Sequence, residues 1–151
     1  MPRKLLLINP ANKVRKGFTN DPSTSFSPLG LGIVAALTPP HWEVELIDES
    51  FGEFAFKQAD LVALTGFTAN APRAYEIAAV YRKAGIHTVM GGIHASMWTH
   101  EVAEYVDTVF TGEAEGAWPE LISDFEAGII KKKCQTGKIY EAEFCSECEM
   151  F

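Results

Sequence analysis

The sequence is short of cysteine, of positive charge and of long apolar runs, and each shortage excludes a class of protein. All of its cysteines lie near the C-terminus, as Cys134, Cys145 and Cys148, which excludes a disulfide framework spread through a secreted fold. Thirteen basic residues against twenty acidic ones give a net charge of −7, which argues against nonspecific binding to nucleic acid. No apolar run reaches the roughly 20 residues of a membrane span. The apolar run at residues 5–8 is also shorter than the ~7–15 residues of a signal-peptide core, so we expect a cytoplasmic protein.

What the sequence does contain is an alternation of short apolar runs with helical patterns. The runs predict strands at residues 4–9, 43–48, 60–65, 88–90 and 108–111. The patterns between and after them predict helices at residues 28–37, 71–83, 100–105 and 118–127. This order predicts an α/β fold with right-handed crossovers and a doubly wound, five-stranded parallel sheet. We expect the flavodoxin-like (Rossmann-like) strand order 2-1-3-4-5 for a domain at residues 1–130, followed by a charged, Cys-containing tail at 131–151.

The predicted strand ends carry small or polar residues, and in this fold ligands bind at the carboxyl ends of the strands. The candidate site residues at these ends are Asn9, Pro10, Thr65, Gly66, Phe67, Thr68, Gly91, Gly92, His94, Gly112 and Glu113. Gly91 and Gly92 have no Cβ, so a flat ligand could approach the main chain there. Gly30 and Gly32, in the first predicted helix, are expected to serve close packing.

Three common sites of this fold do not match the strand ends. A phosphorelay receiver needs an acidic cluster after the first strand and an Asp after the third, where this chain has Asn9-Pro10 and Thr65-Gly66. A flavin mononucleotide site needs a Ser/Thr-rich loop after the first strand, which residues 9–13 do not supply. Gly30-Leu31-Gly32 matches only part of a dinucleotide fingerprint, and no strand directly precedes it.

From about residue 4 to residue 128 the chain resembles the cobalamin (vitamin B12)-binding domain at the N-terminus of radical S-adenosylmethionine (SAM) enzymes. That family includes methyltransferases and the anaerobic cyclase of Mg-protoporphyrin monomethyl ester. The motifs that carry the resemblance are Pro28-Leu29-Gly30-Leu31-Gly32, residues 60–65, residues 71–78, residues 91–96 and Thr111-Gly112-Glu113-Ala114-Glu115-Gly116.

The resemblance implies a cobalamin whose dimethylbenzimidazole tail enters the sheet between the strand ends. Residues 65–67 and Gly91-Gly92 match the two segments that line this slot. Thr65 and Thr68 would hydrogen-bond the tail, and His94 would face the site and touch the corrin. Glu113 and Glu115 would accept hydrogen bonds from corrin amides. On this hypothesis, replacing Gly91 or Gly92 by Val should abolish corrinoid binding without unfolding the domain.

The chain departs from cobalamin-binding families in two motifs. The Asp-x-His-x-x-Gly motif, whose His is the lower cobalt ligand, is missing from residues 9–14, so we expect base-off binding without a histidine ligand. The Cys-x-x-x-Cys-x-x-Cys motif of radical SAM enzymes is also missing, since Cys134 and Cys145-x-x-Cys148 have the wrong spacing. We therefore expect a module that is not catalytic alone. The 4Fe-4S cluster and SAM would belong to a radical SAM catalytic domain, in cis or in trans. Among the histidines no metal-binding spacing occurs.

Two alternative functions remain open from the sequence. The first is a degenerate cobalamin-fold domain without a cofactor, which would act in protein interaction or regulation through an apolar patch near Phe51, Phe54 and Phe56. The second is a small-nucleotide or coenzyme binder at the same strand ends, with a phosphate clamp supplied by residues 13–16.

Overall fold

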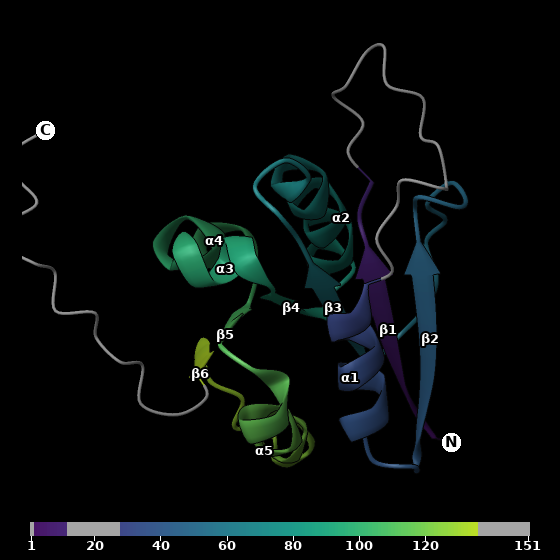
Figure 1. Cartoon of the computed structure of the whole chain (residues 1–151). Helices are drawn as coiled ribbons and strands as arrows, with labels where there is room; N and C mark the ends of the chain where they lie inside the picture. The colour runs from purple at the N-terminus through teal and green to yellow at the C-terminus, as the bar shows by residue number, and fades with distance from the viewer. Residues whose placement is uncertain (1, 12–27, 136–151) are drawn as a thin grey trace, which may run out of the picture.

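The computed structural model describes residues 2–11 and 28–135, which form a parallel sheet covered by helices on both faces (Figure 1). The strand order is β2-β1-β3-β4-β5-β6, and every neighbouring pair is parallel. The strands are β1 (Arg3–Asn9), β2 (Trp42–Asp48), β3 (Leu61–Thr65), β4 (His87–Gly91), β5 (Thr108–Thr111) and β6 (Lys133–Gln135). The helices are α1 (Leu29–Leu37), α2 (Ala71–Lys83), α3 (Ile93–Met97), α4 (Thr99–Tyr105) and α5 (Ala114–Ala127).

The first five strands confirm the predicted order 2-1-3-4-5 and the flavodoxin-like α/β fold. Strands β1 and β3 are central and buried on both faces, which explains their unbroken apolar sequences. Strand β2 lies at one edge and is only partly buried, in agreement with its alternating sequence.

The sheet gains a sixth strand that the sequence did not predict. Strand β6 pairs with β5 inside the segment that was expected to be a tail. The run of lysines that leads into β6 carries no apolar pattern, so the neighbouring strand rather than local propensity accounts for its extended backbone. Cys145 and Cys148, and most of the long loop expected after β1, lie outside the described residues.

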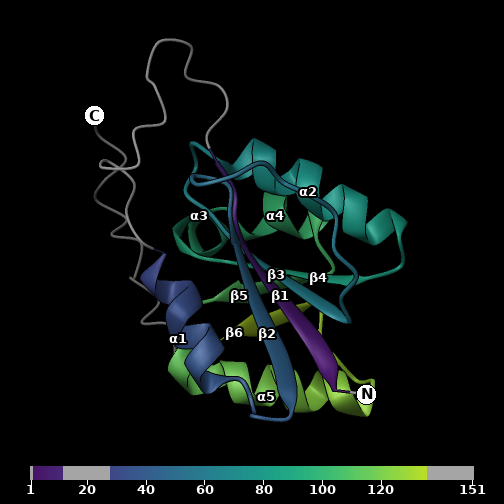
Figure 2. The ribbon, with the colours of Figure 1, turned by 90° about the vertical axis from the view of Figure 1, so that its right-hand side faces the viewer.

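Two hydrophobic clusters lie on opposite faces of the sheet, under the two helix layers that Figure 2 shows edge-on. Alternation along β1 sends Leu5 and Leu7 to the layer of α1 and α5, and Leu6 and Ile8 to the layer of α2, α3 and α4. The α1/α5 layer matters most for function, because it borders the pocket described below. Within the described residues no helix is long and apolar enough to cross a bilayer.

Two helices differ from the sequence-based expectation. Helix α3 follows Gly92 directly, at a position where the sequence predicted no helix. Helix α5 begins at Ala114, before the predicted start at Trp118, and tolerates Pro119 within its early turns. Helix α5 ends at Ala127, as predicted, because the next residue, Gly128, has a φ of +72° in the left-handed region.

Candidate functional site

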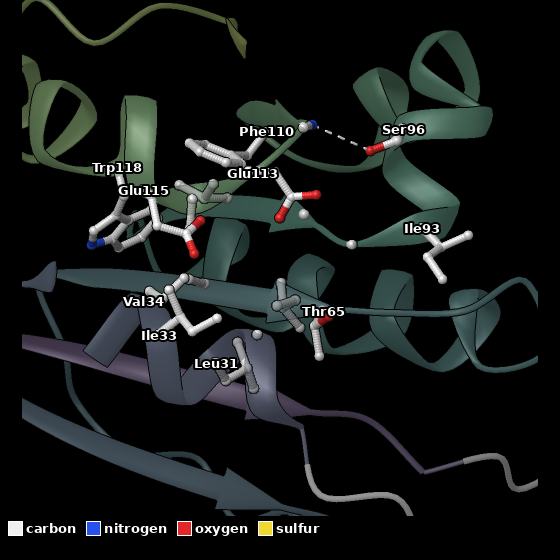
Figure 3. Close-up of a pocket in the computed structure, with 18 of the residues that line it drawn as sticks. Leu31, Ile33, Val34, Thr65, Ile93, Ser96, Phe110, Glu113, Glu115 and Trp118 are labelled. Atoms are coloured by element: carbon white, nitrogen blue, oxygen red, sulfur yellow. Dashed lines mark hydrogen bonds between the residues drawn. The ribbon is translucent and has the colours of Figure 1, made fainter. Parts of the chain in front are cut away.

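A pocket of about 470 Å³ opens at the carboxyl ends of β3 and β4, between α1 and α5 (Figure 3). Its size lies within the roughly 300–1,000 Å³ that is usual for small-molecule sites. Most of the lining residues are apolar or glycine. They are Gly30, Leu31, Ile33, Val34, Ala63, Leu64, Thr65, Val89, Gly91, Gly92, Ile93, Ser96, Met97, Phe110, Gly112, Glu113, Ala114, Glu115 and Trp118.

The floor of the pocket consists of two residue pairs from β3 and β4, one at the carboxyl end of the sheet and one deeper. Thr65 pairs with Gly91 at the carboxyl end of the sheet, and Ala63 pairs with Val89 one level deeper. Because side chains alternate along a strand, both pairs point toward the α1/α5 layer. The floor is therefore polar only at its outer level.

Two glycines leave space in this pocket that a side chain would occupy. A Cβ on Gly91 would lie at an ordinary contact distance of 3.6 Å from Phe110, and a Cβ on Gly30 would meet nothing within 4 Å. Gly32 is equally free of neighbours, so the expectation that Gly30 and Gly32 serve close packing is wrong. Gly30 and Gly91 instead leave the α1 wall and the floor open to a ligand.

Gly92 has a different role, because it brings two loops together. Its backbone has φ +94° and ψ −174°, a conformation that is essentially restricted to glycine. A Cβ there would lie 2.8 Å from Thr65 Oγ1 and 3.2 Å from the Gly66 backbone. The His94 N–H donates to the Gly66 carbonyl at 3.1 Å, which fixes α3 beside the end of β3.

The structure brings five of the candidate site residues to this pocket, namely Thr65, Gly91, Gly92, Gly112 and Glu113. The other candidates do not line it, and they are Asn9, Pro10, Gly66, Phe67, Thr68 and His94.

Asn70 accounts for part of this difference, because it ties the ends of β1 and β3 to each other. Its Nδ2 donates to the Pro10 carbonyl at 2.8 Å, and its Oδ1 accepts from the Phe67 N–H at 2.7 Å. Asn70 makes no side-chain capping bond to α2, because both ends of its amide are used in these contacts. Asn9 Nδ2 donates to Asp48 Oδ1 at 3.1 Å, so that amide is also engaged within the protein.

His94 lies toward α2 and α4 rather than toward the pocket. Its side chain is 3% exposed, with Nε2 2.8 Å from the Tyr75 hydroxyl and Nδ1 3.2 Å from Thr68 Oγ1. Tyr75 donates its proton to Glu101 Oε1, so its oxygen accepts from His94 Nε2–H. Burial, and then the hydrogen bond to Glu101, raise the pKa of Tyr75 well above its usual value, which keeps this donor protonated. The expectation that His94 faces the site therefore does not fit the geometry.

Apart from Glu115, the residues that α1, α3 and α5 contribute to the pocket walls were not predicted as site residues from the sequence. Leu31 and Val34 come from α1, and Phe110 and Trp118 face them from β5 and α5 (Figure 3). The glycine-containing segment at residues 28–32 was the available signal, since it carried part of the family resemblance. What it could not indicate was which helix lies beside α1 on the same face of the sheet.

The pocket lining carries negative charge. Glu113 and Glu115 are the charged lining residues in the described part of the chain, and no basic residue accompanies them. A site for a phosphate-bearing nucleotide needs positive charge or a clamp of backbone N–H groups. Residues 13–16, which we considered for that role, lie outside the described residues. The described lining therefore gives no support to the nucleotide-binding alternative.

The apolar patch considered for protein interaction is used only in part inside the domain, since Phe56 is still 46% exposed. Phe56 stacks on Tyr81 with ring centroids 5.1 Å apart, and Phe54 meets the same ring edge-on at 6.0 Å. Phe51 is 69% exposed.

Within residues 2–11 and 28–135, no group of three or more His, Cys, Asp or Glu side chains is placed to hold a metal ion.

Comparison with known proteins agrees with this fold. Residues 16–122 match the B12 binding domain family, so the chain belongs to that family, and the resemblance to cobalamin-binding domains is confirmed. Two relatives from Chlorobaculum tepidum are bacteriochlorophyllide d methyltransferases. The C-8(2)-methyltransferase is 37% identical over 107 residues, and the C-12(1)-methyltransferase is 33% identical over 132 residues. These matches cover 70% and 85% of this chain but 24% and 28% of the relatives, so the chain spans about a quarter of their length.

Proposed function

We propose that this domain holds cobalamin base-off, with the nucleotide tail in the pocket between α1 and α5. The observation that carries the proposal is the open, mostly apolar pocket at the strand ends, where Gly30 and Gly91 leave space that any side chain would fill. A flat, weakly polar base fits such a lining, because apolar contact drives its burial while few polar groups need partners.

The residues of the rim have distinct tasks in this proposal. Thr65 Oγ1 has no hydrogen-bond partner within the described chain, so it is available to the tail. The Glu113 and Glu115 carboxylates accept hydrogen bonds from corrin amides. Glycine at Gly91 keeps the pocket open between Thr65 and Phe110.

The segment after β1 offers no histidine to cobalt, and polar groups at the end of β1 are bonded within the protein. The Asn9 amide is bonded to Asp48, and the Ala11 N–H donates to Glu49 Oε2 at 3.0 Å. No histidine is present at residues 9–14 or among the described lining residues. Residues 9–14 and the described lining would therefore offer no histidine to take the place of the base as a cobalt ligand.

The relatives favour methyl transfer over a cyclase reaction for the larger assembly, because both are methyltransferases. Bound cobalamin would supply a cobalt centre that carries the methyl group. This domain would orient the upper corrin face toward a radical SAM catalytic domain, in cis or in trans, that holds the 4Fe-4S cluster and SAM. In this arrangement the chain binds and presents the cofactor and does not catalyse the reaction alone.

A visible-absorption titration with methylcobalamin, followed by gel filtration, tests the proposal. We expect the purified chain to retain the corrinoid with a base-off spectrum. We expect His94→Gln to keep both the binding and the spectrum, because His94 faces α2 and α4. The same variant should lose about 1 kcal/mol of stability to urea, because the Tyr75 and Thr68 contacts are weakened.

Each contrary outcome of this titration points to a different error. A base-on spectrum would contradict insertion of the tail. Loss of binding in a folded His94→Gln protein would place His94 in the site after all. A folded wild-type protein that retains no corrinoid would overturn the proposal and favour the interaction-domain alternative.

A further inference from the structure

The deep part of the pocket is alkyl and aromatic, whereas its polar side chains are at the mouth. Ala63 and Val89 form the inner level of the floor, and Leu31 and Val34 form the α1 wall above them. Thr65, Ser96, Glu113 and Glu115 lie at the carboxyl-end rim (Figure 3). A ligand that enters from the rim passes polar groups first and then meets only apolar side chains.

Trp118 is the deep wall residue with a polar side-chain atom, and that atom is already paired. Its indole N–H donates to Thr38 Oγ1 at 3.0 Å. Thr38 Oγ1 in turn donates to the Val34 carbonyl at 2.7 Å. The Trp118 side chain is also 2% exposed and packs edge-on against Phe110, with ring centroids 6.0 Å apart. The tryptophan therefore offers a ligand its ring and not its donor.

The backbone of the floor is also unavailable to a ligand. Ala63 lies in the sheet between β1 and β4, and Val89 lies between β3 and β5. The amides and carbonyls of such central strands are used in the sheet ladder. In the described part of the pocket, the inner end thus has no free hydrogen-bonding group.

From this lining we infer that the pocket selects cobamides by the chemistry of their lower base, accepting an apolar benzimidazole and disfavouring a purine. The inference rests on the proposed function and deepens it. Dimethylbenzimidazole presents a methyl-bearing hydrocarbon edge, which gains from contact with Ala63, Val89 and Leu31. Adenine presents an exocyclic amine and ring nitrogens, which would lose water without gaining partners.

Affinities of the purified chain for methylcobalamin and for the methyl form of the adenine-containing cobamide test this inference. We expect methylcobalamin to bind about tenfold or more tightly, the order expected for burying unpaired polar groups. Adenine is the weaker cobalt ligand and leaves the metal more easily, which acts against this preference. A preference for the benzimidazole form would therefore come from contacts in the pocket and not from the strength of the bond between base and cobalt.

Two variants test whether the deep lining of the pocket causes the preference for the benzimidazole base. Ala63→Ser and Val34→Thr each add one hydroxyl to the deep lining, on the floor and on the α1 wall, and each should reduce the preference several-fold. The matched control is Ala74→Ser, because Ala74 lies in α2 and is fully buried against the opposite face of the sheet. This control should leave the preference unchanged, and circular dichroism reports whether each variant is folded.

The results of these binding experiments distinguish a failure of the inference from a failure of the proposed function. Equal affinity for the two cobamides would overturn the inference while the proposed function stands. A wild-type preference that neither folded variant reduces would also overturn it, because the discrimination would then lie elsewhere. Failure of the folded wild-type chain to bind either cobamide would overturn the proposed function and the inference together.

Discussion

Gly91→Val is expected to weaken cobalamin binding by about 100-fold or more while the domain stays folded. Gly91 has no positive φ, and its Cβ would sit 3.6 Å from Phe110, so β4 can accept a β-branched residue at this position. The methyl groups would occupy the entry between Thr65 and Phe110 that the nucleotide tail uses. Groups as small as a methylene shift pocket affinities by about 10–200-fold, and valine adds more than one.

The control for this experiment is Gly52→Val. Gly52 is exposed, a Cβ there meets nothing within 4 Å, and the residue does not line the pocket. Affinity for methylcobalamin, with circular dichroism on both variants, gives the comparison. Undiminished affinity in a folded Gly91→Val protein would show that the corrinoid tail does not enter here.

Gly92→Ala is expected to lower the free energy of unfolding by about 3 kcal/mol or more. A backbone at φ +94° and ψ −174° is disfavoured for alanine by about 1–3 kcal/mol. The new Cβ would also lie 2.8 Å from Thr65 Oγ1 and 3.2 Å from the Gly66 backbone, so the turn into α3 must shift. The expectation that a glycine can be replaced without harm to the fold therefore stays a prediction for Gly91 and is withdrawn for Gly92.

Urea denaturation of Gly91→Ala and Gly92→Ala provides a matched pair at neighbouring positions. Gly91→Ala should change the stability by less than about 1 kcal/mol, since its Cβ makes only ordinary contacts. If the two variants were equally stable, the restriction that we assign to Gly92 would be wrong.

The sheet could be predicted because its signals are local. The apolar runs at β1 and β3 indicate strands buried on both faces, and the alternating run at β2 indicates an edge. Gly128 indicates the end of α5 for an equally local reason, since glycine accepts the left-handed conformation that closes the helix.

The parts that could not be predicted depend on contacts between distant segments. Strand β6 exists as a partner of β5, and nothing in its own sequence indicates a strand. The direction of the His94 side chain depends on its hydrogen bond to Tyr75, which belongs to another helix. The sequence does not show that contact, and the position of His94 directly after two glycines indicated a residue that faces the ligand. Likewise, Trp118 reaches the pocket because α5 lies beside α1, an arrangement that the spacing of apolar residues does not specify.

The most direct test of our account compares methylcobalamin with methylcobinamide, the same corrin without its nucleotide tail. If the tail occupies the pocket between α1 and α5, wild-type protein should bind methylcobalamin about 100-fold or more tightly than methylcobinamide, which matches the loss expected for Gly91→Val. Gly91→Val should remove most of that difference, because it blocks the tail and leaves the rim that meets the corrin. Equal affinity of the wild-type protein for the two corrinoids would contradict the central claim that this pocket holds the tail.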